Sequence, residues 1–240
     1  MNYGLQLYSV RDSAGKNLLE TIEKVAAQGY KYLEFAGFFG FSAEEVKAKM
    51  DECGVSVSGT HTGWGEIKDH FEETVKYHKT IGNKKIIIPG FSFGTKELVL
   101  NFIDFLNEYQ PKLAAEGITL AYHNHAKEFT TFYDGENVHE MIEKNTNVEF
   151  EIDTYWVYAA GLDPIATLER LAHRVKVIHI KDGTADGKGK PLGLGTAPVD
   201  AVYKKACEMG LLMVVESETL TPSGLEEAQI CIDYLKKAEN

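Results

Sequence analysis

Four short apolar segments in the second half of the chain each end in residues that can bind a metal ion. The polar residues at these ends are His123, His125, Asp153, His179 and Glu216. Imidazole and carboxylate ligands without a thiolate suit a divalent ion of the Mn²⁺, Mg²⁺, Co²⁺ or Zn²⁺ kind. Such an ion polarises a carbonyl or hydroxyl oxygen, and a flanking carboxylate or histidine can then remove a proton from the adjacent carbon. These residue types therefore predict isomerisation, 3-epimerisation or dehydration of a sugar or polyol.

Alternation along each segment places a second polar residue on the same side as each candidate ligand. Residues two apart face the same side of a barrel strand. The resulting pairs are His123 with His125, Glu151 with Asp153, His179 with Lys181, and Glu216 with Glu218. Glu34 ends an earlier apolar segment and His61 ends the next one, so both extend the set. We expect one polar cluster at one end of a barrel.

These side chains can meet only if the segments that carry them are parallel strands of one sheet. Strands are predicted at 3–8, 31–36, 55–61, 85–90, 118–123, 148–153, 175–180 and 211–216. Helices are predicted at 17–28, 42–53, 66–81, 95–116, 136–145, 164–173, 198–209 and 224–237. Alternating strands and helices without a long linker predict an α/β fold, a single (β/α)8 TIM barrel over residues 1–240. A Rossmann-type sheet is disfavoured because no GxGxxG follows the first strand.

Composition and charge narrow the class of partner. The chain has 25 basic and 36 acidic residues, a formal net charge of −11. Such a surface repels polyphosphate, so nucleic-acid and anionic-membrane binding are disfavoured and a small-molecule carbohydrate or polyol is the expected partner. Cys53, Cys207 and Cys231 form no CxxC pair and are expected as reduced thiols. The N-terminus reads as a strand, no signal peptide or membrane span is visible, and a cytoplasmic location is expected. A homo-oligomer is possible.

Several residues near the predicted strand ends admit both a structural and a functional interpretation. Trp64 and Trp156 follow two strands and are either ordinary packing residues or a wall on which a sugar ring stacks. The glycine-rich segment 183–197 is predicted to be a mobile loop over the site. Lys188 and Lys190 in that segment suggest a phosphate site only weakly, because no GK[ST] helix start follows them.

Three motifs resemble a known family. They are YHNHAKEF (122–129), FEIDTYWVYAAGLDP (150–164) and HIKDG (179–183). The chain is similar to the xylose isomerase-like TIM barrel superfamily, in the group called sugar phosphate isomerase/epimerase and its YHNH-type branch. The resemblance implies one divalent metal ion held by a Glu, an Asp, a His and a Glu after strands five to eight. The last three correspond to Asp153, His179 and Glu216. His123 stands where many members have the first Glu, and Glu128 is the alternative ligand from that loop.

The resemblance also implies an activity. The expected reaction is a metal-dependent isomerisation or epimerisation of a sugar, sugar phosphate or keto-sugar through an enediolate. Because the first Glu is missing, a metal-dependent lyase or dehydratase acting on an inosose or 3-keto-sugar is the alternative. A non-catalytic sugar-binding barrel remains open. An endonuclease IV-like enzyme is disfavoured because it needs more ligands and a basic groove.

Roles for the individual residues complete the expectation. Proton transfer or substrate contact during the reaction is assigned to Glu216, His125, Lys181 and Glu34. Substrate binding is assigned to His61, Trp64, Trp156 and Asp182.

Overall fold

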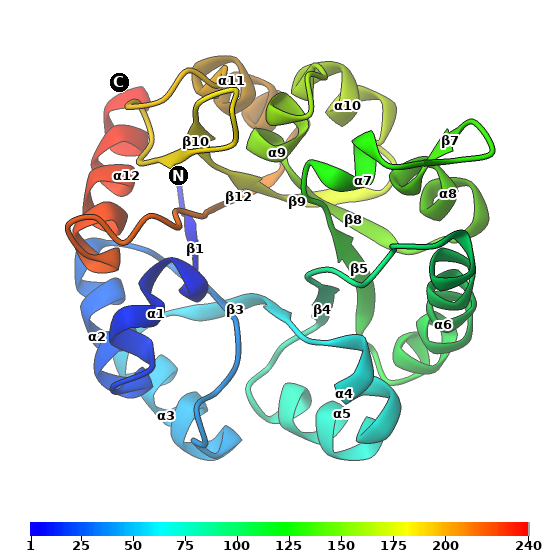
Figure 1. The fold of residues 1–240 in the computed structure, drawn as a ribbon. Coiled ribbons are helices and arrows are strands. Elements are labelled where there is room, and N and C mark those ends of the chain that lie inside the picture. The colour runs from blue at the N-terminus through cyan, green and yellow to red at the C-terminus, as the bar shows by residue number, and fades with distance from the viewer. Residues whose placement is uncertain (240) are drawn as a thin grey trace.

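Residues 1–239 are described by a computed structural model, in which eight parallel strands close into a barrel. The order around the barrel is β1-β12-β9-β8-β5-β4-β3-β2. Their bounds are β1 Gly4–Gln6, β2 Tyr32–Phe35, β3 Ser56–His61, β4 Lys85–Ile88, β5 Thr119–His123, β8 Glu149–Asp153, β9 Val175–Ile180 and β12 Leu212–Val215. Figure 1 looks along the barrel, with the strands around the centre and the helices outside them. The predicted (β/α)8 barrel is confirmed.

Helices on the outside of the barrel form the layer that the sequence predicts between successive strands. They are α2 Leu18–Gln28, α3 Ala43–Cys53, α6 Lys96–Ala115, α8 Val138–Asn145, α10 Pro164–Arg170, α11 Val199–Met209 and α12 Gly224–Ala238. Helix α3 begins with the capping box of Ser42 and Glu45, and it ends at Gly54, whose φ of 63° is left-handed. None of the helices in the described part of the chain has both the length and the apolar character that crossing a membrane requires.

The structure adds short elements that the sequence patterns do not predict. The predicted helix 66–81 is two helices, α4 Trp64–Asp69 and α5 Phe71–Thr80, because His70 leaves the helical conformation with φ −135° and ψ 42°. The predicted strand 85–90 ends at Ile88, since Pro89 has no N–H to donate to a neighbouring strand. The other additions are η1 Leu7–Val10, α1 Arg11–Ala14, α7 Lys127–Thr130, α9 Thr154–Ala159, and two small hairpins, β6 Phe132–Tyr133 with β7 Glu136–Asn137 and β10 Asp182–Gly183 with β11 Gly189–Lys190.

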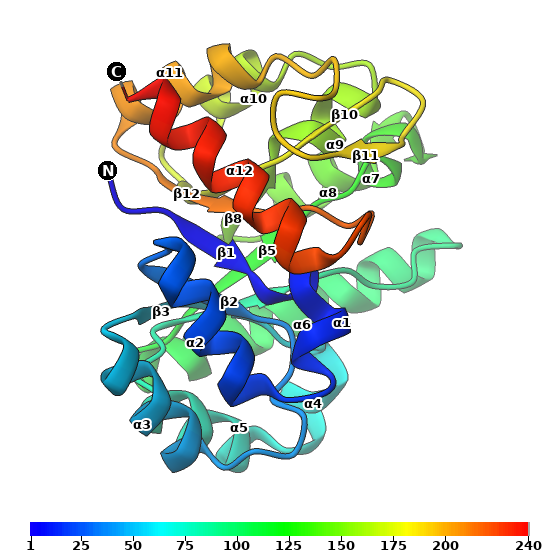
Figure 2. The same ribbon diagram turned by 90° about the vertical axis from the view of Figure 1, so that its left-hand side faces the viewer.

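The apolar core lies between the strands and the helices. On β8 and β9, Phe150, Ile152, Ile178 and Ile180 belong to this core. The residues that alternate with them face the barrel axis, as the pleat of a strand requires. At the end where the strands finish, called the mouth below, these inward residues are polar. The N- and C-terminal ends lie together at the opposite end of the barrel (Figure 2), where the Tyr3 hydroxyl donates to Glu239 at 2.8 Å.

Candidate functional site

Four buried side chains from four strand ends converge at the mouth. They are His123 from β5, Asp153 from β8, His179 from β9, and Glu216 directly after β12, and together they are called the ligand group. One possible ligand atom from each lies within 4.8 Å of those of the others. The register explains this convergence, because Asp153 pairs directly with His179 across β8 and β9. The structure thus brings together the predicted ligands His123, Asp153, His179 and Glu216.

The bonding state of the ligand group fits a divalent ion. Asp153 Oδ2, His123 Nδ1 and His179 Nδ1 are buried and form no hydrogen bond within residues 1–239. Buried polar atoms without a partner are rare in proteins and call for a ligand or another explanation. His179 Nε2 lies 2.7 Å from Glu34 Oε1, and in the tautomer whose proton points to Glu34 the Nδ1 atom has a lone pair for an ion. Mixed carboxylate and imidazole donors of this kind suit Mn²⁺, Mg²⁺, Co²⁺ or Zn²⁺.

A second set of side chains contacts the first. Glu34 and Glu151 are fully buried, and His61, at the end of β3, lies against both. His61 Nε2 is 2.9 Å from Glu151 Oε2 and 3.2 Å from Glu34 Oε1, and the Gln6 amide donates to Glu34 at 2.8 Å. His61, Glu151, His123 and His179 could also surround an ion. Because several of their atoms already bond to one another, we favour the ligand group as the metal position.

Glu151 is the principal site residue that the sequence-based assignment leaves out. Its side chain is fully buried, and Oε2 lies 3.2 Å from His179 Nε2 and 3.4 Å from His123 Nδ1. The signal that points to it is its spacing of two from Asp153, which puts both on the inward side of β8. A buried carboxylate at that position contacts the same imidazoles as the ligand group.

Burial and neighbouring charges shift the pKa values of the carboxylates in opposite directions. Burial raises the pKa of Asp153 to about 6, and it raises the pKa of Glu151 well above its usual value with the Glu34 charge adding to the effect. Burial also acts to raise the pKa of Glu216, but the Lys181 charge and the neighbouring His179 outweigh it and hold that pKa well below its usual value. The crowding of acids in this site favours occupation by a cation, which would hold Asp153 ionised.

Lys181 is the cation that the chain itself supplies to the site. Its ammonium lies 3.0 Å from Glu216 Oε2 and 3.8 Å from Asp153 Oδ2, and it also bonds to Glu218. Burial acts to lower the pKa of Lys181, but Glu216 and the other carboxylates raise it, so the side chain stays charged. The Trp156 ring lies 4.8 Å from the ammonium. Lys181 therefore orients the Glu216 carboxylate from the side that faces away from the pocket.

A pocket of about 330 Å³ opens above the ligand group. Its lining consists of Tyr8, Ala36, His61, Pro89, His123, His125, Glu216 and Glu218. Of the predicted catalytic residues, Glu216 and His125 reach this lining, whereas Glu34 and Lys181 lie behind it. Of the predicted substrate-binding residues, His61 reaches it.

Three predicted site residues are engaged elsewhere in the structure. Glu128 lies outside the ligand group, because its carboxylate accepts the Tyr122 hydroxyl at 2.7 Å and the His125 backbone N–H at 3.1 Å. Trp64 packs edge-on against two phenylalanine rings of α6. Asp182 follows Lys181 by one residue, so its side chain points to the other side and binds the backbone of the loop after it. Trp156, also predicted to bind substrate, lies near the site, where its ring contacts the Lys181 ammonium and the His125 ring.

The segment 183–197, predicted as a mobile loop, contains the β10–β11 hairpin in the structure. Its mobility stays a prediction.

Comparison with solved structures finds other barrels of the same fold. A sugar phosphate isomerase/epimerase from Parabacteroides distasonis is 24% identical, with a TM-score of 0.84 and coverage of 98% of both chains. The probable 3-DHS dehydratase AsbF of Bacillus anthracis, involved in petrobactin synthesis, is 11% identical, with a TM-score of 0.79 and coverage of 98% of this chain and 99% of that one. The IOLI protein, solved with a zinc atom bound, is 15% identical, with a TM-score of 0.77 and coverage of 99% and 98%. At these identities the likeness shows a common fold.

Sequence comparison defines the family. None of the curated proteins matches the chain. Residues 22–238, nearly the whole barrel, match the family described as xylose isomerase-like TIM barrel. The chain therefore belongs to the xylose isomerase-like TIM barrel family.

Proposed function

We propose that this protein is a divalent-metal-dependent isomerase or epimerase of a sugar or keto-sugar. The observation that carries the proposal is the ligand group, in which buried atoms of Asp153, His123 and His179 converge without hydrogen-bond partners. A bound ion would supply polarisation of a substrate carbonyl or hydroxyl oxygen and stabilise the negative charge of an enediolate. The zinc atom in the IOLI structure and the isomerase/epimerase name of the Parabacteroides distasonis protein support this class.

The residues that line the pocket divide the work of proton transfer. Glu216 and His125 both face the pocket, so each can exchange a proton with a substrate carbon or oxygen bound between them. Lys181 holds the Glu216 carboxylate ionised and fixes its orientation. Glu34 holds the Nε2 proton of His179, so Glu34 acts on the reaction through that histidine. Glu34 and Lys181 are therefore positioning residues in this proposal.

A metal-dependent lyase or dehydratase is the second candidate, and one observation favours it. Epimerisation by two carboxylates needs an acid on each side of the substrate, and here the β5 position of the ligand group is His123. Glu128, the other acid of that loop, is held by Tyr122 and the His125 backbone. One carboxylate, Glu216, with one histidine, His125, suits removal of a proton from one carbon and protonation of a leaving group. The dehydratase name of the Bacillus anthracis relative agrees with this chemistry.

Product analysis on the metal-loaded protein separates the two reactions. A panel of ketoses, inososes and 3-keto-sugars would be incubated with the protein and the products weighed by mass spectrometry. A product of unchanged mass supports isomerisation or epimerisation, and loss of water or of an aglycone supports the lyase. If Glu216→Gln binds sugar as the wild type does and the wild type converts none of the panel, the barrel is a carbohydrate-binding protein and the proposal is wrong.

A further inference from the structure

The two loops that most often bind phosphate in barrels of this architecture are those after the seventh and eighth strands. In this protein these loops follow β9 and β12. A phosphate bound there would be held by backbone N–H groups, hydroxyls and cations of the two loops. The state of those donors therefore shows whether the pocket is built for a phosphorylated substrate.

In the loop after β9, the carboxylate of Asp182 occupies the place where the loop could otherwise bind an external anion. Asp182 is 2% exposed and accepts four backbone N–H groups. Oδ1 accepts those of Gly183 at 2.7 Å and Ala197 at 3.2 Å, and Oδ2 accepts those of Gly193 and Gly195, each at 2.9 Å. The fit is close, because a Cβ on Gly195 would lie 2.2 Å from Asp182 Oδ1. We call these four amides with Asp182 the filled cradle.

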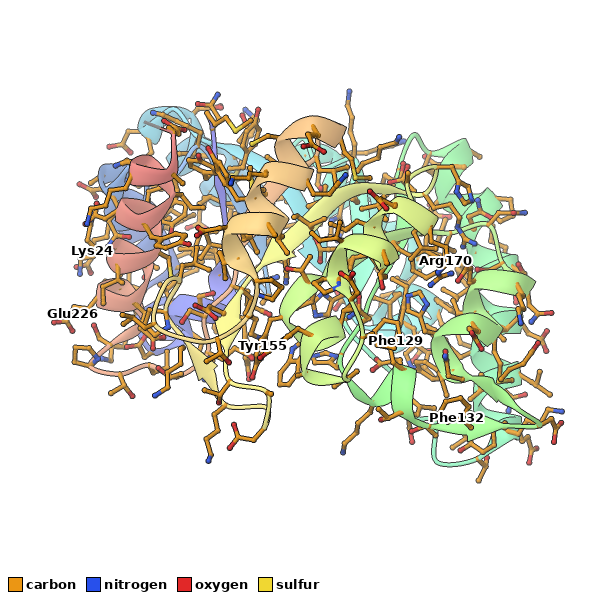
Figure 3. All side chains as sticks on the ribbon, turned by 90° about the horizontal axis from the view of Figure 1, so that it is seen from above. Lys24, Phe129, Phe132, Tyr155, Arg170 and Glu226 are labelled. Atoms are coloured by element: carbon orange, nitrogen blue, oxygen red, sulfur yellow. The ribbon has the colours of Figure 1, made fainter. Side chains whose placement is uncertain are left out.

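The same loop is closed from the α9 side. Tyr155 of α9, labelled in Figure 3, donates its hydroxyl to the Thr184 carbonyl at 3.0 Å. A Cβ on Gly183 would lie 2.5 Å from the Tyr155 ring. Little room remains for an external anion beside the cradle.

The loop after β12 has the same arrangement. Glu227 of α12 is fully buried, and its Oε2 accepts the Leu220 N–H at 3.0 Å and the Ser217 hydroxyl at 2.9 Å. Its Oε1 accepts the Thr219 hydroxyl. The Ser217 N–H donates to the Ser9 hydroxyl at 3.0 Å. These four donors of the loop are therefore also satisfied by the chain itself.

Three cations near the mouth, Lys181, Arg11 and Lys188, already have partners within the chain. No lysine or arginine of residues 1–239 lines the pocket, and Glu216 and Glu218 do line it. Lys181 lies among three carboxylates. Arg11 directs one terminal nitrogen to the Tyr8 carbonyl at 2.8 Å and the other to the Glu218 carbonyl at 2.9 Å. Lys188 pairs with Asp186 at 2.6 Å.

We infer that the pocket takes an uncharged carbohydrate or polyol without a phosphate group. This inference rests on the proposed function and names the substrate class for the same site. Beyond the ligand group, a phosphate dianion would meet the Glu218 carboxylate, and none of the described lining residues is a lysine or arginine that could offset its charge. The pocket volume of about 330 Å³ equals that of roughly eleven waters at about 30 Å³ each, which is enough for one monosaccharide.

The first test asks whether the mouth has an anion site at all. Inorganic phosphate would be titrated into the metal-free wild-type protein by isothermal titration calorimetry, so that no ion can bind the phosphate directly. We expect no saturable binding at millimolar phosphate. Saturable binding that Glu218→Gln leaves intact and that phosphorylated ketoses abolish by competition would overturn the inference.

The second test compares substrates on the metal-loaded protein. Each ketose or keto-polyol of the panel would be assayed next to its phosphate ester. We expect turnover of the uncharged compound and at least a tenfold lower kcat/KM for the ester. That ratio corresponds to a loss of about 1.4 kcal/mol or more in transition-state stabilisation. A higher kcat/KM for the ester would overturn the inference and leave the proposed function standing. If no compound is turned over, the proposed function fails, and the phosphate titration still decides whether an anion site exists.

The third test opens the filled cradle. Asp182→Ala leaves four N–H groups without their acceptor, and formate or phosphate should then bind there and raise Tm above that in chloride of equal ionic strength. Asp186→Ala, which removes an exposed acid of the same loop, is the matched control and should show no anion-specific change. If Asp182→Ala responds to anions no more than the control, the cradle is not an anion site. Asp182→Asn, which keeps one acceptor oxygen, replaces the alanine variant if the latter does not fold.

Discussion

Asp153 ends β8 and Asp182 follows the neighbouring strand β9, yet they differ in what satisfies their carboxylates. Both are buried, and the sequence suggests a site role for each. Asp153 Oδ1 caps α9 through the Trp156 N–H at 3.0 Å, while Oδ2 faces the ligand group without a hydrogen bond within the described residues. Both oxygens of Asp182 are saturated by backbone N–H groups. Position and burial at a strand end are shared by both, so the free lone pair is what distinguishes the candidate ligand from the loop anchor.

The largest expected effect comes from Asp153, the aspartate whose Oδ2 has no hydrogen bond within the described residues. Asp153→Asn keeps the α9 cap, because the amide oxygen still accepts the Trp156 N–H, and removes one charged ligand. Metal content after dialysis should fall from one equivalent toward zero. Loss of a residue that only contacts a metal ligand lowers activity about 10–100-fold, and turnover of Asp153→Asn should fall by more than that. Elemental analysis and steady-state kinetics measure both, and unchanged metal content would remove Asp153 from the ligand group.

Substitution of Asp182, whose oxygens are both hydrogen-bonded, should change the stability of the protein and leave its metal content unchanged. Asp182→Asn replaces a charged acceptor of four N–H groups by one amide oxygen and an amide that donates. Hydrogen bonds to charged groups contribute about 1.5–3 kcal/mol each, and part of them is lost, so we expect the free energy of unfolding to fall by about 2–4 kcal/mol. Urea denaturation of the metal-free protein measures this. Metal stoichiometry should stay at one equivalent, and its loss would show that the two aspartates do not differ as described.

A smaller effect is expected from the group that holds a ligand in place. Glu34→Ala removes the acceptor of the His179 Nε2 proton, so Nδ1 is no longer fixed as the free nitrogen. Metal affinity should fall about 10–100-fold, as it does when outer-shell partners of metal-binding histidines are lost. Glu34→Gln keeps an oxygen at the same place and should retain most of the affinity. Competition with a chromophoric chelator measures the two variants, and equal losses would show that charge and not the hydrogen bond matters.

The smallest effect tests whether an unpartnered buried group can be structural. His139 of α8 is fully buried, neither ring nitrogen forms a hydrogen bond within residues 1–239, and the ring stacks on Phe129 and Phe150 at centroid distances of 4.6 and 4.7 Å. Figure 3 labels Phe129, on which the ring stacks, and Arg170, whose charge acts on it. Here the neutral imidazole packs as an aromatic ring and does not belong to the ligand group.

Burial lowers the pKa of His139 from 6.5 to about 3, with the charges of Arg170 and Arg174 adding to the effect. The unfolded chain therefore binds the proton first as the pH falls. The stability that the neutral ring contributes is fully present above pH 6.5 and is lost as the pH falls toward 3, by at most about 1.4 kcal/mol per pH unit. His139→Phe should flatten the pH dependence of Tm in this window. A wild-type slope in the variant would show that other groups cause it.

Much of the fold follows from patterns that are local in the sequence. Alternating apolar residues and glycine or capping signals predict eight strands and the helices between them, and the strand at 175–180 is found at the predicted residues. The same alternation predicts that polar residues two apart on a strand share a side, and the structure brings possible ligand atoms of His123, Asp153, His179 and Glu216 within 4.8 Å of one another. Short elements such as α7 and the β10–β11 hairpin are not predicted, because they depend on contacts that their own sequence does not contain.

The sequence by itself determined the barrel, the strand that carries each polar residue and the side on which it lies, because strand alternation and helix capping are set by neighbouring residues. Only the tertiary structure decided which buried acids keep a free lone pair. Asp182 and Glu227 meet donors that lie in the loops after β9 and β12, and Glu128 turns to Tyr122, whereas Asp153 meets two imidazoles from other strands. A carboxylate has the same few acceptor sites everywhere, and the path of distant backbone determines what fills them.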